Sequence, residues 1–378
     1  MPSRNLTIIQ INDTHGYLEA HPELVWRGDV ASYPMMGDYA RIASILKSVR
    51  AECAGSVLAL DNGDTFHGTY PAVRSKGEAF IPLVNALRFD AMTAHWEFAW
   101  GPPHFRALAA RLNHSMLAIN CYDKQSDGLY FPVSTVVDRG GLRVGIIGIA
   151  ATIIDKSMPP HFSAGLRFTS GCEELPAEIR RLRTDERTEV IIVLSHLGFP
   201  QDVSLAGNVK DINVIVSGHT HNRLEKPVRV GDALIIQSGC HESFVGRLDL
   251  DILDGENANS RHHLIPVDDS VEADAEMDGL VEGVMRPHRE MLREVVGQTT
   301  VGLHRDTNLY APMDDLLLAA VAAAAETDIA FSNGWRYGAP IPPRPITMND
   351  LWNIIPTNPA VSTVDLTGAE IKEMMEEI

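Results

Sequence analysis

The chain has 378 residues, with 32 Lys and Arg against 50 Asp and Glu, and its formal net charge is −18. The length suggests two domains that can each bury a core, and the 45% hydrophobic and 22% charged content excludes a disordered chain. The acidic balance argues against a protein that holds polymeric nucleic acid or an anionic membrane on a basic face, although bound metal ions can still supply local positive charge for a small anionic substrate.

The first two thirds of the chain alternate short β-branched apolar runs with helix-like stretches. Six runs are predicted as buried strands: Leu6–Ile11, Val57–Leu60, Val144–Ile149, Val190–Leu194, Val214–Val216 and Ala233–Ile236. Short strands that are apolar on both faces and separated by helical segments are typical of an α/β domain with buried sheets. A Leu/Asp alternation around Arg247–Asp251 predicts one last strand with a solvated face.

The rest of the chain indicates a connecting segment and the start of a second α/β domain. Residues 270–298 carry Met, Leu and Val at helical spacing, interrupted by Pro287, and predict a pair of helices. A small-residue helix is predicted at Leu316–Glu326, before the loop SNGWRYG and a Pro-rich turn, and an amphipathic helix begins at Thr367. We therefore predict domains at 1–268 and 299–378, joined by a helical linker at 269–298.

The four cysteines are far apart and form no CxxC pair, so we expect free thiols and neither a disulfide scaffold nor a structural zinc site. No apolar run reaches the ~18 residues that a membrane helix needs. The N-terminus enters a strand-like run without a basic segment and an apolar segment before it. We therefore expect a cytoplasmic protein with no membrane partner.

Acidic and imidazole side chains directly follow five of the strand-like segments. In chain order these endings are Asp13-Thr14-His15, Gly63-Asp64, His95-Trp96-Glu97, His196 and Gly218-His219-Thr220-His221. Because ligands bind beyond the carboxyl ends of strands in open α/β sheets, we expect these side chains to meet at one edge. Two carboxylates and five imidazoles form a donor set that suits divalent metals such as Zn, Mn or Fe.

This order of motifs resembles the calcineurin-like dinuclear metallophosphoesterases and, within them, the 5′-nucleotidase branch. The resemblance covers essentially the whole chain and is carried by QINDTHGYLE, DNGDTFHGT, VLSHLG, VIVSGHTHN, GRLDLD and the C-terminal stretch that begins DIAFSNGWRYG. It implies an α/β fold, a four-layer α/β/β/α sandwich followed by a smaller α/β substrate domain. That second domain is expected to be truncated here, because the family's domain continues further.

The resemblance also implies two divalent ions that share one carboxylate. One ion would be held by Asp13, His15, Asp64 and His221, and the other by Asp64, His196, His219 and a fourth group. Two cations ~3.5–4 Å apart need a bridging anion, and a water between them can attack phosphorus in line without a covalent intermediate. Mn, Zn, Fe or Mg could fill such a site, and we favour Mn. The sequence has neither a GxSxG elbow nor a P-loop.

The third motif departs from the Gly-Asn-His-Glu-Phe-Asp of the 5′-nucleotidase branch. In direct register His95 replaces the metal-binding Asn, Trp96 replaces the catalytic His, and Ala99 replaces the Asp that orients it. His95 is therefore either the missing ligand of the second ion or a general acid. We favour the ligand, because an unfilled metal position costs more than a slower leaving group.

The altered motif is similar to another branch, the thiosulfohydrolases of the sulfur-oxidation system, which also carry a His-Trp-Glu-Phe segment. The segments MMGDYARIA and SNGWRYG are similar to that branch too. Its members use a dimanganese site to hydrolyse a sulfur–sulfur bond on a carrier protein outside the cytoplasm, and the expected cytoplasmic location argues against that role.

Further candidates lie around these motifs. Arg41, in a segment that both branches share, could face the substrate anion and joins Asp64 and His95 as a predicted catalytic residue. His67 is expected beside the metal ligands and His241 along the same rim. The family's substrate domain contacts its ligand at the positions of Asn333, Trp335 and Arg336, where Arg offers a planar fork to an anion and Trp a face to a base.

The sequence thus predicts a metal-dependent, 5′-nucleotidase-like hydrolase of small phosphate monoesters, with a nucleotide as substrate and no polymeric nucleic acid as partner. Two alternatives stay open. One is thiosulfohydrolase-like cleavage of an S-sulfonate or sulfur ester, motivated by His95 and Trp96. The other is a non-catalytic metal-binding module, motivated by the lost Asp-His pair.

Overall fold

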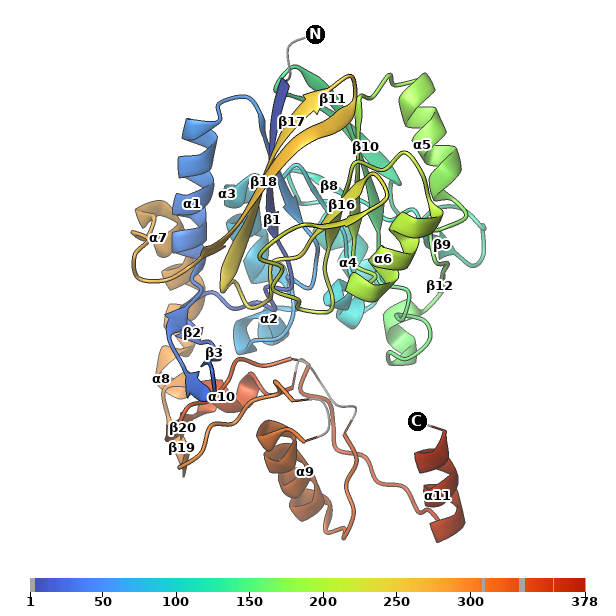
Figure 1. The fold of residues 1–378 in the computed structure, drawn as a ribbon. Coiled ribbons are helices and arrows are strands. Elements are labelled where there is room, and N and C mark those ends of the chain that lie inside the picture. The colour runs from blue at the N-terminus through green and yellow to red at the C-terminus, as the bar shows by residue number, and fades with distance from the viewer. Residues whose placement is uncertain (1–3, 308–309, 333–336, 356, 378) are drawn as a thin grey trace.

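Two six-stranded mixed sheets face each other in a computed structural model that describes residues 4–307, 310–332, 337–355 and 357–377 (Figure 1). The first sheet has the order β18-β17-β1-β6-β7-β8, and the second has the order β10-β11-β13-β14-β16-β15. In the first, β1, β6, β7 and β8 run parallel; in the second, β11, β13, β14 and β16 do. The remaining strands add antiparallel edges.

The strands of the first sheet are β1 (Arg4–Ile11), β6 (Val57–Asp61), β7 (Ala91–Met92), β8 (Ser115–Met116), β17 (Phe244–Leu253) and β18 (Glu256–Pro266). Those of the second are β10 (Ser134–Arg139), β11 (Leu142–Ile149), β13 (Val190–Ser195), β14 (Val214–Ser217), β15 (Val228–Val230) and β16 (Ala233–Ile236). Each of the six predicted strands therefore lies within a strand of the structure.

Helices cover the outer face of each sheet, and apolar side chains fill the space between the sheets. The first sheet packs against α1 (Tyr39–Glu52), α3 (Ile81–Leu87) and α4 (Pro102–Ala109), and the second against α5 (Leu175–Thr184) and α6 (Phe199–Asn208). Helix α7 (Ala275–Met285) packs on α1 and α3. Ile8, Val144 and Val216 are among the buried residues between the sheets. Because both faces of the central parallel strands are covered, β6, β13 and β14 read as continuous apolar runs, whereas β17 alternates. The predicted four-layer α/β/β/α sandwich is confirmed.

The segment after the sandwich differs in part from the predicted helix pair. After α7 come the 3-10 turn η4 (Arg286–His288) and the short helix α8 (Arg289–Leu292), but Val295–Thr299 forms strand β19 and pairs with β20 (Arg344–Thr347). The last residues of the predicted helical linker are therefore extended, as the β-branched Val295-Val296 pair favours. The smaller C-terminal part also contains α9 (Pro312–Ala325), α10 (Met348–Trp352) and α11 (Gly368–Glu376).

Several short elements were not predicted. The strands are β2 (His21–Pro22), β3 (Val25–Arg27), β4 (Val30–Ser32), β5 (Met35–Met36), β9 (Cys121–Asp123) and β12 (Leu166–Phe168). The helical turns are α2 (Tyr70–Ser75), η1 (Glu78–Phe80), η2 (Trp96–Trp100) and η3 (Pro160–Ser163). No helix among the described residues is long and apolar enough to cross a membrane.

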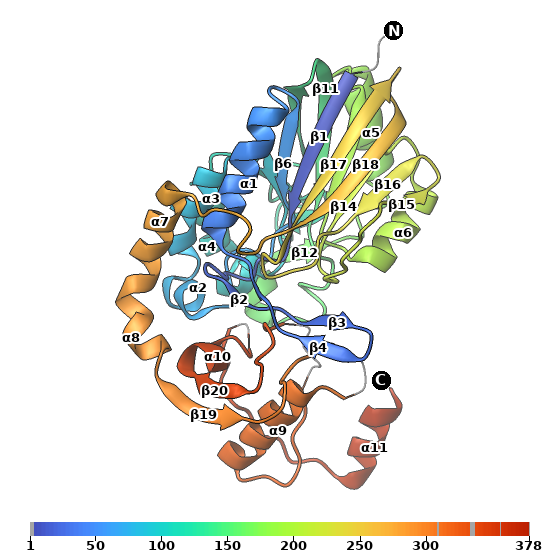
Figure 2. The same cartoon turned by 60° about the vertical axis from the view of Figure 1, so that its left-hand side comes forward.

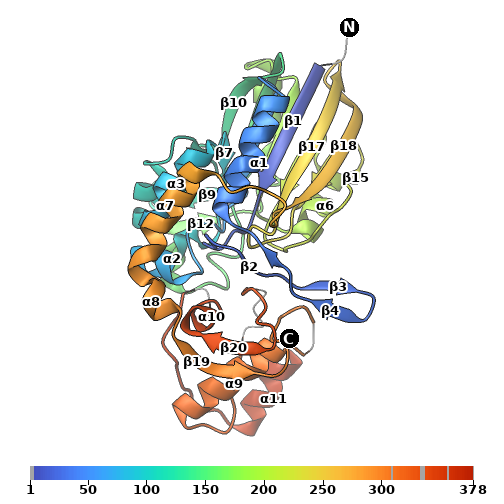
Figure 3. The ribbon, with the colours of Figure 1, turned by 90° about the vertical axis from the view of Figure 1, so that its left-hand side faces the viewer.

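The C-terminal part lies beyond one end of the sandwich, where the parallel strands of both sheets finish. Figures 2 and 3 show β19, β20 and α9–α11 at this end, with the β3–β4 hairpin extending beside them. The Ala339 backbone N–H donates to the Tyr17 hydroxyl at 2.8 Å, and the Trp26 indole N–H donates to Asp306. Chain segments from both parts of the protein therefore meet where the strand ends carry their polar side chains.

Candidate metal centre

Each predicted ligand sits on a turn directly after a strand, and most of these turns have an unusual backbone. Positive φ angles occur at Asp13 (52°), His15 (53°), Asp64 (59°), His219 (75°) and His221 (59°). Such conformations cost of order 1–3 kcal/mol for residues other than glycine and occur often at functional sites. Two backbone bonds between the first two turns stabilise them, from Asp13 N to Gly63 O (3.0 Å) and from His15 N to Asp64 O (2.7 Å).

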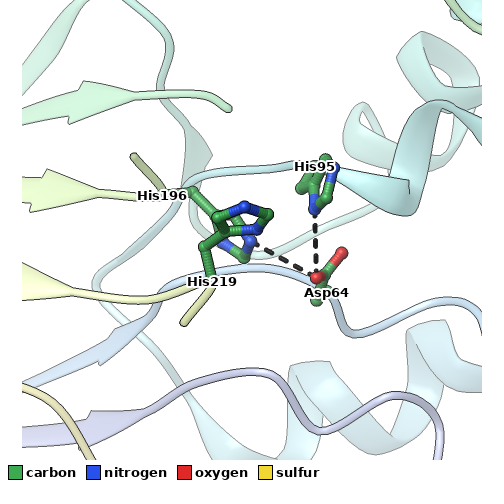
Figure 4. A group of neighbouring side chains, drawn as sticks. All are labelled: Asp64, His95, His196 and His219. Carbon is green, nitrogen blue, oxygen red and sulfur yellow. Dashed lines mark hydrogen bonds and ion pairs between the residues drawn. The ribbon is translucent and has the colours of Figure 1, made fainter. Parts of the chain in front are cut away.

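The structure brings all seven predicted metal ligands together in two adjoining groups. The first ligand group consists of Asp13, His15 and His221, and the second of Asp64, His95, His196 and His219. In the first, the Nε2 atoms of His15 and His221 lie 2.9 Å apart. In the second, Asp64 Oδ2 lies 3.1 Å from His95 Nδ1 and 3.3 Å from His196 Nε2 (Figure 4). In each group, ligand atoms lie close enough together to bind the same cation. The first group offers two imidazole nitrogens, and the second offers imidazole nitrogens around one carboxylate oxygen.

The ligands are held in place by partners just outside the groups. The His196 Nδ1–H donates to the Asn62 carbonyl at 2.6 Å, which leaves the Nε2 atom facing the site. Asp13 Oδ2 accepts the Asn12 side-chain amide at 2.6 Å, and Asp64 Oδ1 accepts the Trp96 backbone N–H at 2.9 Å. Each of these partners is one or two residues from a ligand or at a strand end, so their closeness in sequence is a signal that could have identified them.

Glu97 holds the altered third motif against the Asp64 turn. Its buried carboxylate accepts the backbone N–H of His95 at 2.7 Å and that of Thr65 at 2.6 Å. These two hydrogen bonds join the backbone at His95 to the backbone at Thr65. Glu97 therefore sets the position of His95, a predicted ligand, relative to the Asp64 turn. It was not among the predicted site residues.

Burial and neighbouring charges hold Asp64 and His219 in the protonation states that bind cations, but not His196. Burial by itself would raise the pKa of Asp64, but nearby His95, His196 and His67 outweigh it and hold that pKa well below its usual range. Burial, with His95 and His196 beside it, lowers the pKa of His219 to about 3, so this imidazole is neutral. Burial also acts to lower the pKa of His196, but Asp64 and Asp13 raise it to about 9, so this residue must lose a proton when a metal binds.

Arg41, in the first turn of α1, acts electrostatically on two carboxyls. It opposes the burial that raises the pKa of Asp38 and adds to the Ser270 bonds that lower the pKa of Asp268. Its predicted contact with the substrate anion stays a prediction. The predicted substrate residues Asn333, Trp335 and Arg336 fall outside the described residues.

A cavity of about 730 Å³ opens beside the first ligand group, and its walls come from both parts of the chain. His221, Arg223 and His241 line it from the sandwich, and Arg305 and Asp315 line it from the C-terminal part. His241 thus lies along the predicted rim. Arg305 is almost fully buried and pairs with Asp314 at 2.7 Å. The cavity gives a small molecule access to the edge of the ligand groups.

Comparisons with known proteins agree with this architecture. Residues 6–223 match the calcineurin-like phosphoesterase family, and residues 295–378 match the 5′-nucleotidase C-terminal domain. The chain is 25% identical to the trifunctional nucleotide phosphoesterase YfkN of Bacillus subtilis, over 99% of this chain and 27% of that protein. It is 24% identical to a 5′-nucleotidase of Vibrio vulnificus, over 98% of this chain and 75% of that protein. The chain thus spans about a quarter of the Bacillus protein's length.

Two solved structures from Thermus thermophilus share the fold. The sulfate thiohydrolase SoxB superposes with a TM-score of 0.84 at 23% identity, over 93% of this chain and 74% of SoxB. A 5′-nucleotidase precursor superposes with a TM-score of 0.82 at 24% identity, over 93% of this chain and 73% of that chain. At these identities the likeness establishes the fold and leaves the choice of substrate open.

Proposed function

This chain belongs to the calcineurin-like phosphoesterases, and we propose that it hydrolyses small phosphate monoesters with two divalent ions and without a covalent intermediate. The observation that carries the proposal is the adjacency of the two ligand groups. His196 Nε2 of the second group lies 3.6 Å from Asp13 Oδ1 of the first, and Asp64 contacts His196 from the neighbouring turn. Asp13 and Asp64 would hold the two cations, and their negative charge would offset the repulsion between the ions.

When bound, two such ions acidify a coordinated water and stabilise the charge of the phosphoryl group. The chain's own residues supply the frame for this chemistry. Asp13 and Asp64 place negative charge in a buried site, and the Asn62 carbonyl orients His196 toward it. Tyr337 from the C-terminal part packs edge-on against His15, with ring centroids 5.2 Å apart, and shields this side of the site from water.

A nucleoside monophosphate is the substrate type that we propose. The cavity of about 730 Å³ lies within the ~300–1,000 Å³ typical of small-molecule sites, and it opens beside His221. Arg223, Arg305 and several carboxylates along its walls can bind the hydroxyl and amino groups of a nucleoside. The names of the Bacillus and Vibrio relatives, a nucleotide phosphoesterase and a 5′-nucleotidase, support the same substrate class.

The test is phosphate release by Mn-loaded protein on a panel of nucleotides and sugar phosphates. We expect phosphate release from at least one nucleoside monophosphate. Asp64→Asn should lose this activity, whereas the matched control Asp232→Asn, at an exposed position, should keep it. A protein that holds two ions per chain and releases phosphate from no ester on the panel would overturn the proposal. If it also releases no sulfate from sulfur substrates, the non-catalytic module becomes the better description.

A second candidate is hydrolysis of an S-sulfonate, and the altered third motif favours it. Trp96 is part of the site, since its backbone N–H donates to Asp64 and its indole stacks on His67 with ring centroids 5.1 Å apart. The same Mn-loaded preparation can be given a peptide with an S-sulfocysteine. Sulfate release without phosphate release would favour this candidate, and the reverse would exclude it.

A further inference from the structure

One buried imidazole next to the ligands has no part in the function proposed above. His67 lies on the turn between β6 and α2, three residues after Asp64, and its side chain is fully buried. Its Nε2 atom is 3.0 Å from His15 Nδ1 and 3.1 Å from Asp64 Oδ1. His67 therefore contacts a predicted ligand of each ligand group, although it is separated from His15 by 52 positions.

The two nitrogens of His15 face different neighbours. Its Nε2 atom faces His221 within the first ligand group, and its Nδ1 atom faces His67. An imidazole that binds a cation through Nε2 carries its proton on Nδ1, and this N–H needs an acceptor. At 3.0 Å, the Nε2 atom of His67 lies where it can accept this N–H, and in that arrangement the proton of His67 is on its own Nδ1.

The contact with Asp64 makes the tautomer of His67 depend on whether a cation is bound. Asp64 Oδ1 lies 3.1 Å from the same Nε2 atom and also accepts the backbone N–H of Trp96. Without a cation, a proton on Nε2 would satisfy this contact, whereas a cation on His15 Nε2 requires the other tautomer, because the Nδ1–H of His15 then needs an acceptor. Nδ1 of His67 has no hydrogen-bond partner among the described residues, so it does not oppose the change. The Trp96 ring stacks on the His67 ring at 29° and restrains its rotation. His67 is thus held with Nε2 toward His15.

We propose that His67 is a positioning residue of the metal centre, which accepts the Nδ1–H of His15 and so keeps the Nε2 atom of His15 available to a cation. It acts through His15 and does not touch the ion. The inference rests on the proposed metal centre, but its test measures metal binding and needs no catalytic activity. The competing arrangement is direct ligation, because His15, Asp64 and His67 also form a group with donor atoms within 4.8 Å of one another.

The test is a calorimetric titration of the metal-free 378-residue chain with Mn²⁺ and Zn²⁺. His67→Leu removes the acceptor at similar size, His67→Gln keeps an acceptor oxygen, and His114→Leu is a control at a half-buried histidine near Phe89. We expect His67→Leu to weaken one ion by about 10–100-fold, the typical effect of losing an outer partner, while two ions still bind at saturation. The metal affinity of His67→Gln should stay within a fewfold of that of the unaltered chain, and His114→Leu should bind both ions as tightly as the unaltered chain.

Nitrogen-15 NMR of the Zn-loaded, histidine-labelled chain tests the tautomer without any change at His67, with the His15 signals assigned by the loss of signals in His15→Gln. We expect His15 with a slowly exchanging proton on Nδ1 and with Nε2 bound to zinc. Unchanged affinities in His67→Leu, binding of only one ion at saturation, or a His15 proton on Nε2 would each overturn the proposal, as would a chain that binds no divalent ion. Normal metal binding with no phosphate release would refute the proposed function and leave this inference standing.

Discussion

Replacing His95 by alanine and by asparagine separates the two roles that its position in the sequence allows. His95 Nδ1 lies 3.1 Å from Asp64 Oδ2 in the second ligand group, together with His196 and His219. This geometry favours a ligand over a general acid. We therefore expect His95→Ala to lose tight binding of one ion, whereas His95→Asn, which presents an amide oxygen from the same backbone position, should retain two ions per chain.

The size of the effect follows from the number of ligands. Binding of a structural zinc ion by four protein ligands contributes about 10–16 kcal/mol, so one ligand of four accounts for roughly 2.5–4 kcal/mol. At about 1.4 kcal/mol per tenfold, His95→Ala should weaken the ion of the second ligand group by roughly 10²–10³-fold. His95→Asn should lose less, because an oxygen remains and Glu97 still holds the backbone N–H of residue 95 at 2.7 Å.

The assay is Mn²⁺ titration of chelator-treated protein, with metal content measured by mass spectrometry and phosphate release followed across pH. Thermal unfolding of the metal-free variants provides the folding control, because His95 is buried and its removal leaves a cavity. The reasoning is refuted if His95→Ala binds both ions as tightly as the unaltered chain. If that variant also loses the basic limb of its pH–rate profile, His95 is the general acid.

Three further predictions concern the turn glycine, an unpaired histidine and the leaving group. In urea unfolding, Gly68→Ala should destabilise the metal-free protein by about 2 kcal/mol more than Gly28→Ala. A Cβ at Gly68 would lie 2.3 Å from the His15 carbonyl oxygen, whereas Gly28, also at positive φ, has open space around it. Equal losses of stability in the two variants would contradict this reasoning. Burial lowers the pKa of His114 to about 4, below the ~6.5 of an unfolded chain, so stability should fall by up to about 3 kcal/mol as pH drops from ~6.5 to ~4. Denaturant unfolding of a His114→Gln variant should lack this loss, and an identical pH dependence would count against it. Trp96 cannot protonate a leaving group as an imidazolium would, so substrates with poor leaving groups should react slowly. We expect kcat/KM to fall by about 10²-fold or more from aryl to alkyl phosphates. Values within tenfold of each other would show that another group protonates the leaving group.

The sequence indicated the sandwich and the ligands because both depend on local patterns. Apolar runs of β-branched residues mark strands that are covered on both sides, and the six predicted runs all lie within strands of the two sheets. Parallel strands finish at a common edge of their sheet, so the polar residues after β1, β6 and β7 lie near one another, as do those after β13 and β14. The packing of the two sheets brings these two edges together. All seven predicted metal ligands meet there for this reason.

The tertiary structure alone decided how these residues are oriented and what supports them. Asp13, His15 and Asp64 adopt left-handed backbone conformations that are uncommon for residues other than glycine, and bonds between the β1 and β6 turns hold them there. The pairing of His67 with His15 depends on the same contact between segments far apart in the chain. The electrostatic effect of Arg41 on Asp268 likewise joins residues far apart in the chain. Local sequence specifies strands and the residues that end them, whereas side-chain direction at a strained turn depends on long-range hydrogen bonds that exist only once the sheets have formed.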